Sequence, residues 1–191
     1  MFKWKAAGIH FRLFLFFLLI GLCTDVSMYY LRETGQSKYL PIVFTIYSLI
    51  ESIVFYWMIL ENAKSKPLKL ILKSLIFVTI LFWILIHVLS FLALLEQKPG
   101  QLFDPFYEVA VAFMAGFTLL QMVESEDAIS RMPNFWILLG IFFYCFCTFF
   151  IMGFLNTLLS QKIWFLNNIF NIISYLFYAI GFWKLNQPKA V

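Results

Sequence analysis

Six long apolar stretches dominate this chain and limit what it can fold into. Each is 21 to 26 residues long, and about 20 apolar residues suffice to cross the hydrocarbon core of a bilayer as a helix. They cover residues 11–31, 40–60, 70–95, 103–123, 134–159 and 163–183. The stretches do not alternate polar and apolar residues as barrel strands do, and a backbone in lipid must satisfy its own hydrogen bonds. The sequence therefore predicts an all-α polytopic membrane bundle of six transmembrane helices, with residues 1–191 forming a single domain.

The composition excludes several classes of protein. Hydrophobic residues make up 63% of the 191 residues and charged residues 13%, and the mean hydropathy is +0.88. A soluble fold of this size leaves too much surface in water to hide so much apolar area. A soluble enzyme, a nucleic-acid-binding protein and a disordered tail are therefore excluded. Since no connection between the stretches exceeds ten residues, the function must lie in the bilayer, at its surfaces or in a partner.

The basic residues predict an orientation. One side of the membrane would hold ten of the 14 Lys and Arg residues: Lys3, Lys5, Arg12, Lys64, Lys66, Lys69, Lys73, Arg131, Lys184 and Lys189. The other side would hold four: Arg32, Lys38, Lys98 and Lys162. Short loops rich in Lys and Arg stay in the cytoplasm. We therefore expect both termini to be cytoplasmic, in a bacterial inner (plasma) membrane.

Polar side chains inside the stretches gather at one depth. Ionisable groups in a membrane helix are costly and mark candidate functional sites. With the orientation above, the central or outer parts of the stretches contain Asp25, Glu51, His87, Glu108, Asn167 and Asn171. The inner half contains almost nothing comparable. This asymmetry predicts a polar pocket that opens outward above an apolar floor.

Helical spacing indicates that these residues face inward. In the last stretch, polar and small residues recur at steps of four, three, four and three, which is one face of a helix: Asn167, Asn171, Ser174, Tyr178 and Gly181. In the second stretch, Tyr47 and Glu51 share a face with Ser48. The predicted binding pocket therefore consists of Asp25, Tyr47, Glu51, His87, Glu108, Asn167, Asn171 and Tyr178.

A purely structural interpretation of the same residues stays open. Asn, Ser and Tyr side chains often link membrane helices by hydrogen bonds and do nothing else. Asp25 or Glu51 could pair with His87 to neutralise a buried charge. Glu108 lies close enough to the outer end of its predicted span to be hydrated.

Several membrane chemistries lack the residues that they need. A retinal protein requires a lysine within the last helix, whereas Lys184 follows the last predicted span. Zinc catalysis would have only two histidines, His10 and His87, to combine with carboxylates. The chain also lacks a nucleophile-elbow motif and a selectivity-filter loop. We therefore predict no cofactor, no metal site and no catalytic residue.

Three short segments resemble a bacterial family of small multipass membrane proteins with six or seven helices. They are residues 46–51 (IYSLIE), 133–136 (PNFW) and 167–180, which contains NNIFNI and YAI. The resemblance implies the bundle architecture and singles out Glu51 and the Asn167–Asn171 face. It implies no reaction, because that family has no established activity. Its members often carry one more helix at the start.

The function expected from the sequence is non-enzymatic. An outward pocket with basic cytoplasmic loops suits a small-ligand sensor or an accessory subunit that acts through partners. The alternative is a small transporter or channel that couples protons or ions through Glu51 and Asp25, and an intramembrane enzyme comes third. The expected partners are the lipid bilayer, a small ligand or ion, and a membrane protein or a second copy of the chain. Nucleic acid is not expected.

Overall fold

The computed structural model describes residues 8–95, 97–125, 128–153 and 160–185, without the side chains of residues 152–153 and 160–164. The described part contains no strand and is an all-α bundle. Its elements are α1 (Ile9–Glu33), η1 (Ser37–Tyr39), α2 (Leu40–Asn62), α3 (Lys66–Phe91), α4 (Pro99–Ser125), η2 (Ile129–Arg131), α5 (Pro133–Gly153) and α6 (Ser160–Leu185). Six helices are long and apolar enough to cross a membrane, which indicates an integral membrane protein.

The described ends of the helices differ from the predicted spans by up to four residues. The third span was predicted to end at Leu95, but α3 ends at Phe91. There Ala93 adopts a φ of 55°, and the amide of Leu94 donates to the carbonyl of Leu89 at 3.0 Å, which closes the helix with a left-handed residue. The fourth span was predicted to begin at 103, but α4 begins four residues earlier, at Pro99. The end of the fifth predicted span, residues 154–159, lies outside the described residues.

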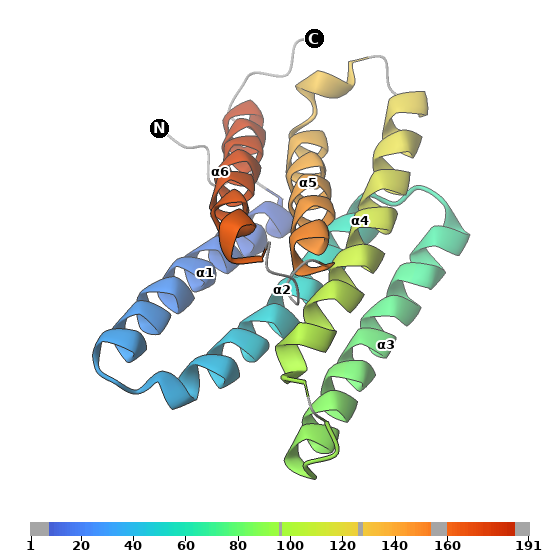
Figure 1. Ribbon diagram of the computed structural model, residues 1–191. Coiled ribbons are helices and arrows are strands. Elements are labelled where there is room, and N and C mark those ends of the chain that lie inside the picture. The colour runs from blue at the N-terminus through green and yellow to red at the C-terminus, as the bar shows by residue number, and fades with distance from the viewer. Residues whose placement is uncertain (1–7, 96, 126–127, 154–159, 186–191) are drawn as a thin grey trace.

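Consecutive helices along the chain run in opposite directions, and α2 occupies the centre of the bundle (Figure 1). It packs against α1, α3, α4 and α5, while α5 also packs extensively against α4 and α6. The hairpin of α1 and α2 leans away from α5 and α6, so its connecting end projects to one side (Figure 1). We call the end where α1, α3 and α5 begin the basic end, because seven described Lys and Arg residues lie there: Arg12, Lys64, Lys66, Lys69, Lys73, Arg131 and Lys184.

Aromatic rings join α1 to α6 near the basic end. Phe14 is fully buried and lies 5.0 Å from the ring of Tyr178, edge to face, and 6.3 Å from the ring of Phe182. One turn further along α1, Phe17 lies edge to face with Phe55 of α2, at 5.6 Å. Such ring pairs bury large apolar areas in preferred geometries. They form an apolar layer between α1, α2 and α6.

Candidate functional site

A cavity of about 460 Å³ lies between α1, α2, α5 and α6, on the side of the aromatic layer that is farther from the basic end. We call it the amide cavity, because three asparagines of α6 line it. Its lining residues are Phe17, Leu18, Thr24, Asp25, Met28, Tyr29, Arg32, Phe44, Tyr47, Glu51, Phe55, Tyr144, Asn167, Asn168, Asn171, Ser174, Tyr175 and Tyr178. The structure thus brings together six of the eight residues predicted for the pocket. It places the other two, His87 and Glu108, elsewhere.

Glu51 is the buried carboxyl group of the amide cavity. It lies in the middle of α2 and is 5% exposed. The phenol of Tyr107 on α4 donates a hydrogen bond to its Oε2 at 2.5 Å, and the phenol of Tyr47 donates to its Oε1 at 3.3 Å. A buried carboxyl group is costly unless its oxygens find partners, and here both oxygens accept from tyrosines. Two helices therefore hold this side chain in one orientation.

Close helix packing positions two of the tyrosines. A Cβ atom at Gly140 of α5 would lie 2.5 Å from the ring of Tyr178, so this glycine leaves room for that ring. On α1, a Cβ atom at Gly21 would lie 3.0 Å from the hydroxyl of Tyr47. The ring of Tyr47 also stacks on Phe17, at 5.9 Å and 11°. Because Gly21 of α1 and Gly140 of α5 have no side chain, the rings of Tyr47 and Tyr178 can pack closely against these helices and line the cavity.

The face of α6 supplies amides to the cavity. Asn167 and Asn171 are half-buried, and Ser174 is buried with its hydroxyl donating to the carbonyl of Phe170 at 2.9 Å. This is the face that the steps of three and four predicted. An asparagine amide both donates and accepts hydrogen bonds, so the wall can bind ligand groups of either kind.

The mouth of the cavity lies toward the end opposite the basic end. Asp25 and Arg32 are exposed residues of α1 that line it, and Tyr29 lies between them. In this region the ribbon of α1 leans away from that of α6 (Figure 1), and all three side chains are exposed. The polar residues therefore extend from the buried Glu51 to the surface.

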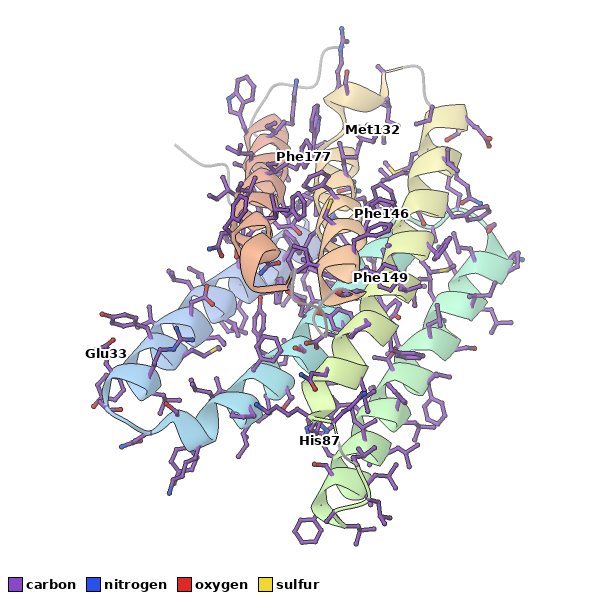
Figure 2. All side chains as sticks on the ribbon, in the orientation of Figure 1. Glu33, His87, Met132, Phe146, Phe149 and Phe177 are labelled. Carbon is purple, nitrogen blue, oxygen red and sulfur yellow. The ribbon has the colours of Figure 1, made fainter. Side chains whose placement is uncertain are left out.

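The expectation that His87 shares this cavity, or pairs with Asp25 or Glu51, was wrong. His87 lies near the start of α4 and lines a different cavity (Figure 2). Its Nδ1 donates to the carbonyl of Trp83 at 2.8 Å, and its Nε2 lies 3.3 Å from Oγ1 of Thr45. These partners come from its own helix and from the start of α2. The packing of α3 on the far side of α2 separates His87 from the amide cavity.

Glu108 was predicted to line the pocket, with hydration near the interface as the alternative, and its position fits neither. Glu108 is 2% exposed and does not line the amide cavity. It lies nine residues into α4, which is about 14 Å along the helix, because α4 begins earlier than predicted. Its Oε2 has no hydrogen-bond partner among the described residues, while Thr148 of α5 lies within hydrogen-bonding reach of its carboxyl group.

The sequence interpretation missed three polar residues next to this site. Asp104 and Tyr107 of α4 are 3% and 1% exposed, and Tyr144 of α5 lines the cavity. Both Asp104 and Asp25 are close enough to interact electrostatically with Glu51. The spacing of four between Asp104 and Glu108 could have identified this face of α4. Nothing distinguishes Tyr144 within the apolar run around it.

The described residues contain no group of three or more His, Cys, Asp or Glu side chains that could hold a metal ion. The arrangement can instead bind a small polar molecule through carboxyl, amide and phenol groups. No protein-family model, curated protein or solved structure matches this chain. The candidate site therefore rests on its own geometry.

Proposed function

We propose that this chain is a non-enzymatic protein of a bacterial inner membrane that binds a small organic cation in the amide cavity. It would act as a sensor or accessory subunit through a partner. Both termini would be cytoplasmic, so that the cavity opens outward. The observation that carries the proposal is the buried Glu51 at the inner part of an open, tyrosine-lined cavity.

The chemistry of the lining favours a cation. Glu51 and Asp25 contribute carboxyl groups, and the asparagines contribute amide oxygens. Five tyrosine rings from four helices add faces that attract a positive charge: Tyr29, Tyr47, Tyr144, Tyr175 and Tyr178. Arg32 is the one cationic residue in the lining. It lies at the mouth, in the last turn of α1, whereas Glu51 lies in the middle of α2.

The aromatic layer favours binding over passage. Phe14 and Phe17 are 0% and 3% exposed, and they pack against α6 and α2 where the cavity ends. A molecule bound beside Glu51 would meet this layer before it could reach the basic end. A change in the spacing of α1 and α6 on binding is a signal that a partner at either membrane surface could read.

A transporter that couples protons is the second candidate, and the buried carboxyl groups favour it. Glu51, Asp104 and Glu108 are each at most 5% exposed, and they come from two helices in contact. Intramembrane carboxyl groups of this kind form proton relays in pumps and transporters. This alternative requires α1 and α6 to separate at the aromatic layer.

Binding can be tested with three probes of equal length: butylammonium, butanol and butyrate. Saturation-transfer NMR on the detergent-solubilised protein would measure their binding. We expect butylammonium to bind most tightly, and Glu51→Gln to weaken it about tenfold or more, because a charge-assisted hydrogen bond is lost. The matched control is Glu61→Gln, which changes an exposed residue at the end of the same helix and should have no effect.

Equal binding of the three probes, or an undiminished affinity in Glu51→Gln, would refute the proposal. Uptake distinguishes the second candidate. If proteoliposomes accumulate butylammonium under a pH gradient, and Glu51→Gln abolishes this accumulation, the protein is a transporter. Binding without uptake supports the sensor or accessory role.

A further inference from the structure

A second cavity, of about 580 Å³, lies between α2, α3 and α4 at the end opposite the basic end. We call it the Trp83 cavity. It is bordered by the beginnings of α2 and α4 and by the end of α1, and its lining residues include Arg32, Phe44, Thr45, Trp83, His87, Lys98 and Asp104. It meets the amide cavity at Met28, Arg32 and Phe44, but its deep residues are different ones.

An incompletely paired carboxyl group lines the Trp83 cavity. Asp104 is 3% exposed, and its Oδ1 has no hydrogen-bond partner among the described residues. Ser48 of α2 lies within hydrogen-bonding reach of the same carboxyl group. A buried polar atom without a partner is costly, so this oxygen is a natural acceptor for a ligand that donates.

The wall beside this oxygen is rigid and aromatic. The indole Nε1 of Trp83 donates to the carbonyl of Thr45 at 3.0 Å, which ties α3 to α2. The ring of His87 stacks on the indole at 4.0 Å, and both of its nitrogens have partners. The wall formed by Trp83 and His87 is therefore preformed and needs no ligand to hold it in place.

The rim carries two cations. Arg32 at the end of α1 and Lys98 just before α4 are exposed and line the cavity. They stand where a helix bundle in a membrane would meet the phospholipid headgroups. Guanidinium and ammonium groups there are suited to bind a phosphate.

The mouth of the cavity is apolar. Ile42 and Ile46 of α2 line it and are 56% and 47% exposed. The adjoining end of α3 exposes Ile84, Val88 and Phe91. In a membrane these side chains contact acyl chains, so the cavity opens sideways to lipid as well as toward the headgroups.

We propose that the Trp83 cavity binds a phosphatidylethanolamine molecule. Its ammonium group would donate to Asp104, its phosphate would lie between Arg32 and Lys98, and its acyl chains would follow the exposed faces of α2 and α3. A zwitterionic headgroup, with a positive ammonium group and a negative phosphate, matches a site that has one buried acceptor and two cations at its rim. A purely anionic headgroup would leave Asp104 without a donor, and a soluble molecule would not use the apolar mouth.

The test is lipid competition in nanodiscs with native mass spectrometry. Phosphatidylethanolamine, phosphatidylcholine and phosphatidylglycerol with identical acyl chains would be offered in equal amounts. We expect about tenfold preference for phosphatidylethanolamine over phosphatidylcholine, whose methylated nitrogen has no N–H to donate. Asp104→Asn removes the negative charge but keeps an acceptor oxygen, so it should reduce this preference, while Lys98→Gln should weaken binding of all three lipids.

Two controls accompany these variants. Lys38→Gln removes a cation from the same end of the bundle that does not line the cavity, and it should change nothing. Each variant should still bind butylammonium if the amide cavity functions as proposed. If wild type shows no butylammonium binding either, circular dichroism replaces it as the check on folding, so the two proposals are tested separately.

The proposal is overturned if phosphatidylethanolamine and phosphatidylcholine bind equally, if phosphatidylglycerol binds best, or if Asp104→Asn keeps the wild-type preference. Free phosphoethanolamine provides the last arm of the test. It should bind far more weakly than the lipid, and equal binding would show a headgroup site without a role for acyl chains, which contradicts a lipid site.

Discussion

The phenol of Tyr107 donates a 2.5 Å hydrogen bond to Oε2 of Glu51 and thereby joins α4 to α2 across the core of the bundle. Both residues are buried, at 1% and 5% exposure. The bond fixes the carboxyl group on one side, while Tyr47 and the amide cavity face it on the other. This contact thus links the stability of the fold to the orientation of the proposed ligand-binding group.

Tyr107→Phe should therefore destabilise the protein. The variant leaves one buried oxygen of Glu51 without its donor, at a cost of about 1–3 kcal/mol. Thermal unfolding in detergent would measure the change as a lower midpoint. Tyr39→Phe is the matched control, because Tyr39 is 45% exposed. An unchanged midpoint in Tyr107→Phe would mean that the hydrogen bond contributes nothing to stability.

Gly140→Ala should disturb both the packing of α5 on α6 and the amide cavity. The added methyl group would lie 2.5 Å from the ring of Tyr178 and 3.1 Å from the carbonyl oxygen of Ser174. Overpacking of this kind costs about 1–3 kcal/mol. We expect a lower unfolding midpoint and weaker butylammonium binding, because Tyr178 must move. At Gly100 the nearest atom would be 3.5 Å away, so Gly100→Ala should be tolerated.

The amides of Asn62 and Asn134 should be coupled energetically. Nδ2 of Asn134 at the start of α5 donates to Oδ1 of Asn62 at the end of α2, at 2.6 Å. Such bonds between membrane helices contribute about 0.6 kcal/mol on average and up to about 1.7. A double-mutant cycle of Asn62→Ala and Asn134→Ala would measure the coupling, and the bond from Asn62 to its own helix cancels in it. Strictly additive effects would contradict the prediction.

The distribution of Lys and Arg predicts the orientation in the membrane. In a variant without Cys23, Cys145 and Cys147, Lys38→Cys should react with an impermeant maleimide in intact cells. Lys66→Cys should react only after the membrane is opened. The reverse pattern would place the mouth of the amide cavity in the cytoplasm, and would reverse the direction of the proposed sensing.

Much of the fold was predictable because hydrophobic length is a local property. Each helix satisfies its own backbone hydrogen bonds, so about 20 apolar residues predict a membrane-spanning helix without any knowledge of its neighbours. The face of α6 with Asn167, Asn171 and Tyr178 was predictable for the same reason, since steps of three and four define one side of a helix. The ends of the helices were less predictable from the sequence. Ala93 adopts the left-handed conformation that glycine usually adopts at such positions, and α3 therefore ends before its apolar run does.

What the sequence by itself determined is thus the number of helices, their approximate positions and which of their faces are polar. Only the tertiary structure decided which polar faces meet. Depth and facing together put His87 in the same zone as Glu51, yet α3 packs on the other side of α2 and turns His87 toward Thr45. The partners of Glu51 were equally hidden, because Tyr107 lies 56 residues away on α4. Which helices become neighbours depends on how well many side chains from different helices pack together, such as Tyr178 against Gly140. A local sequence pattern within one helix does not specify these long-range contacts.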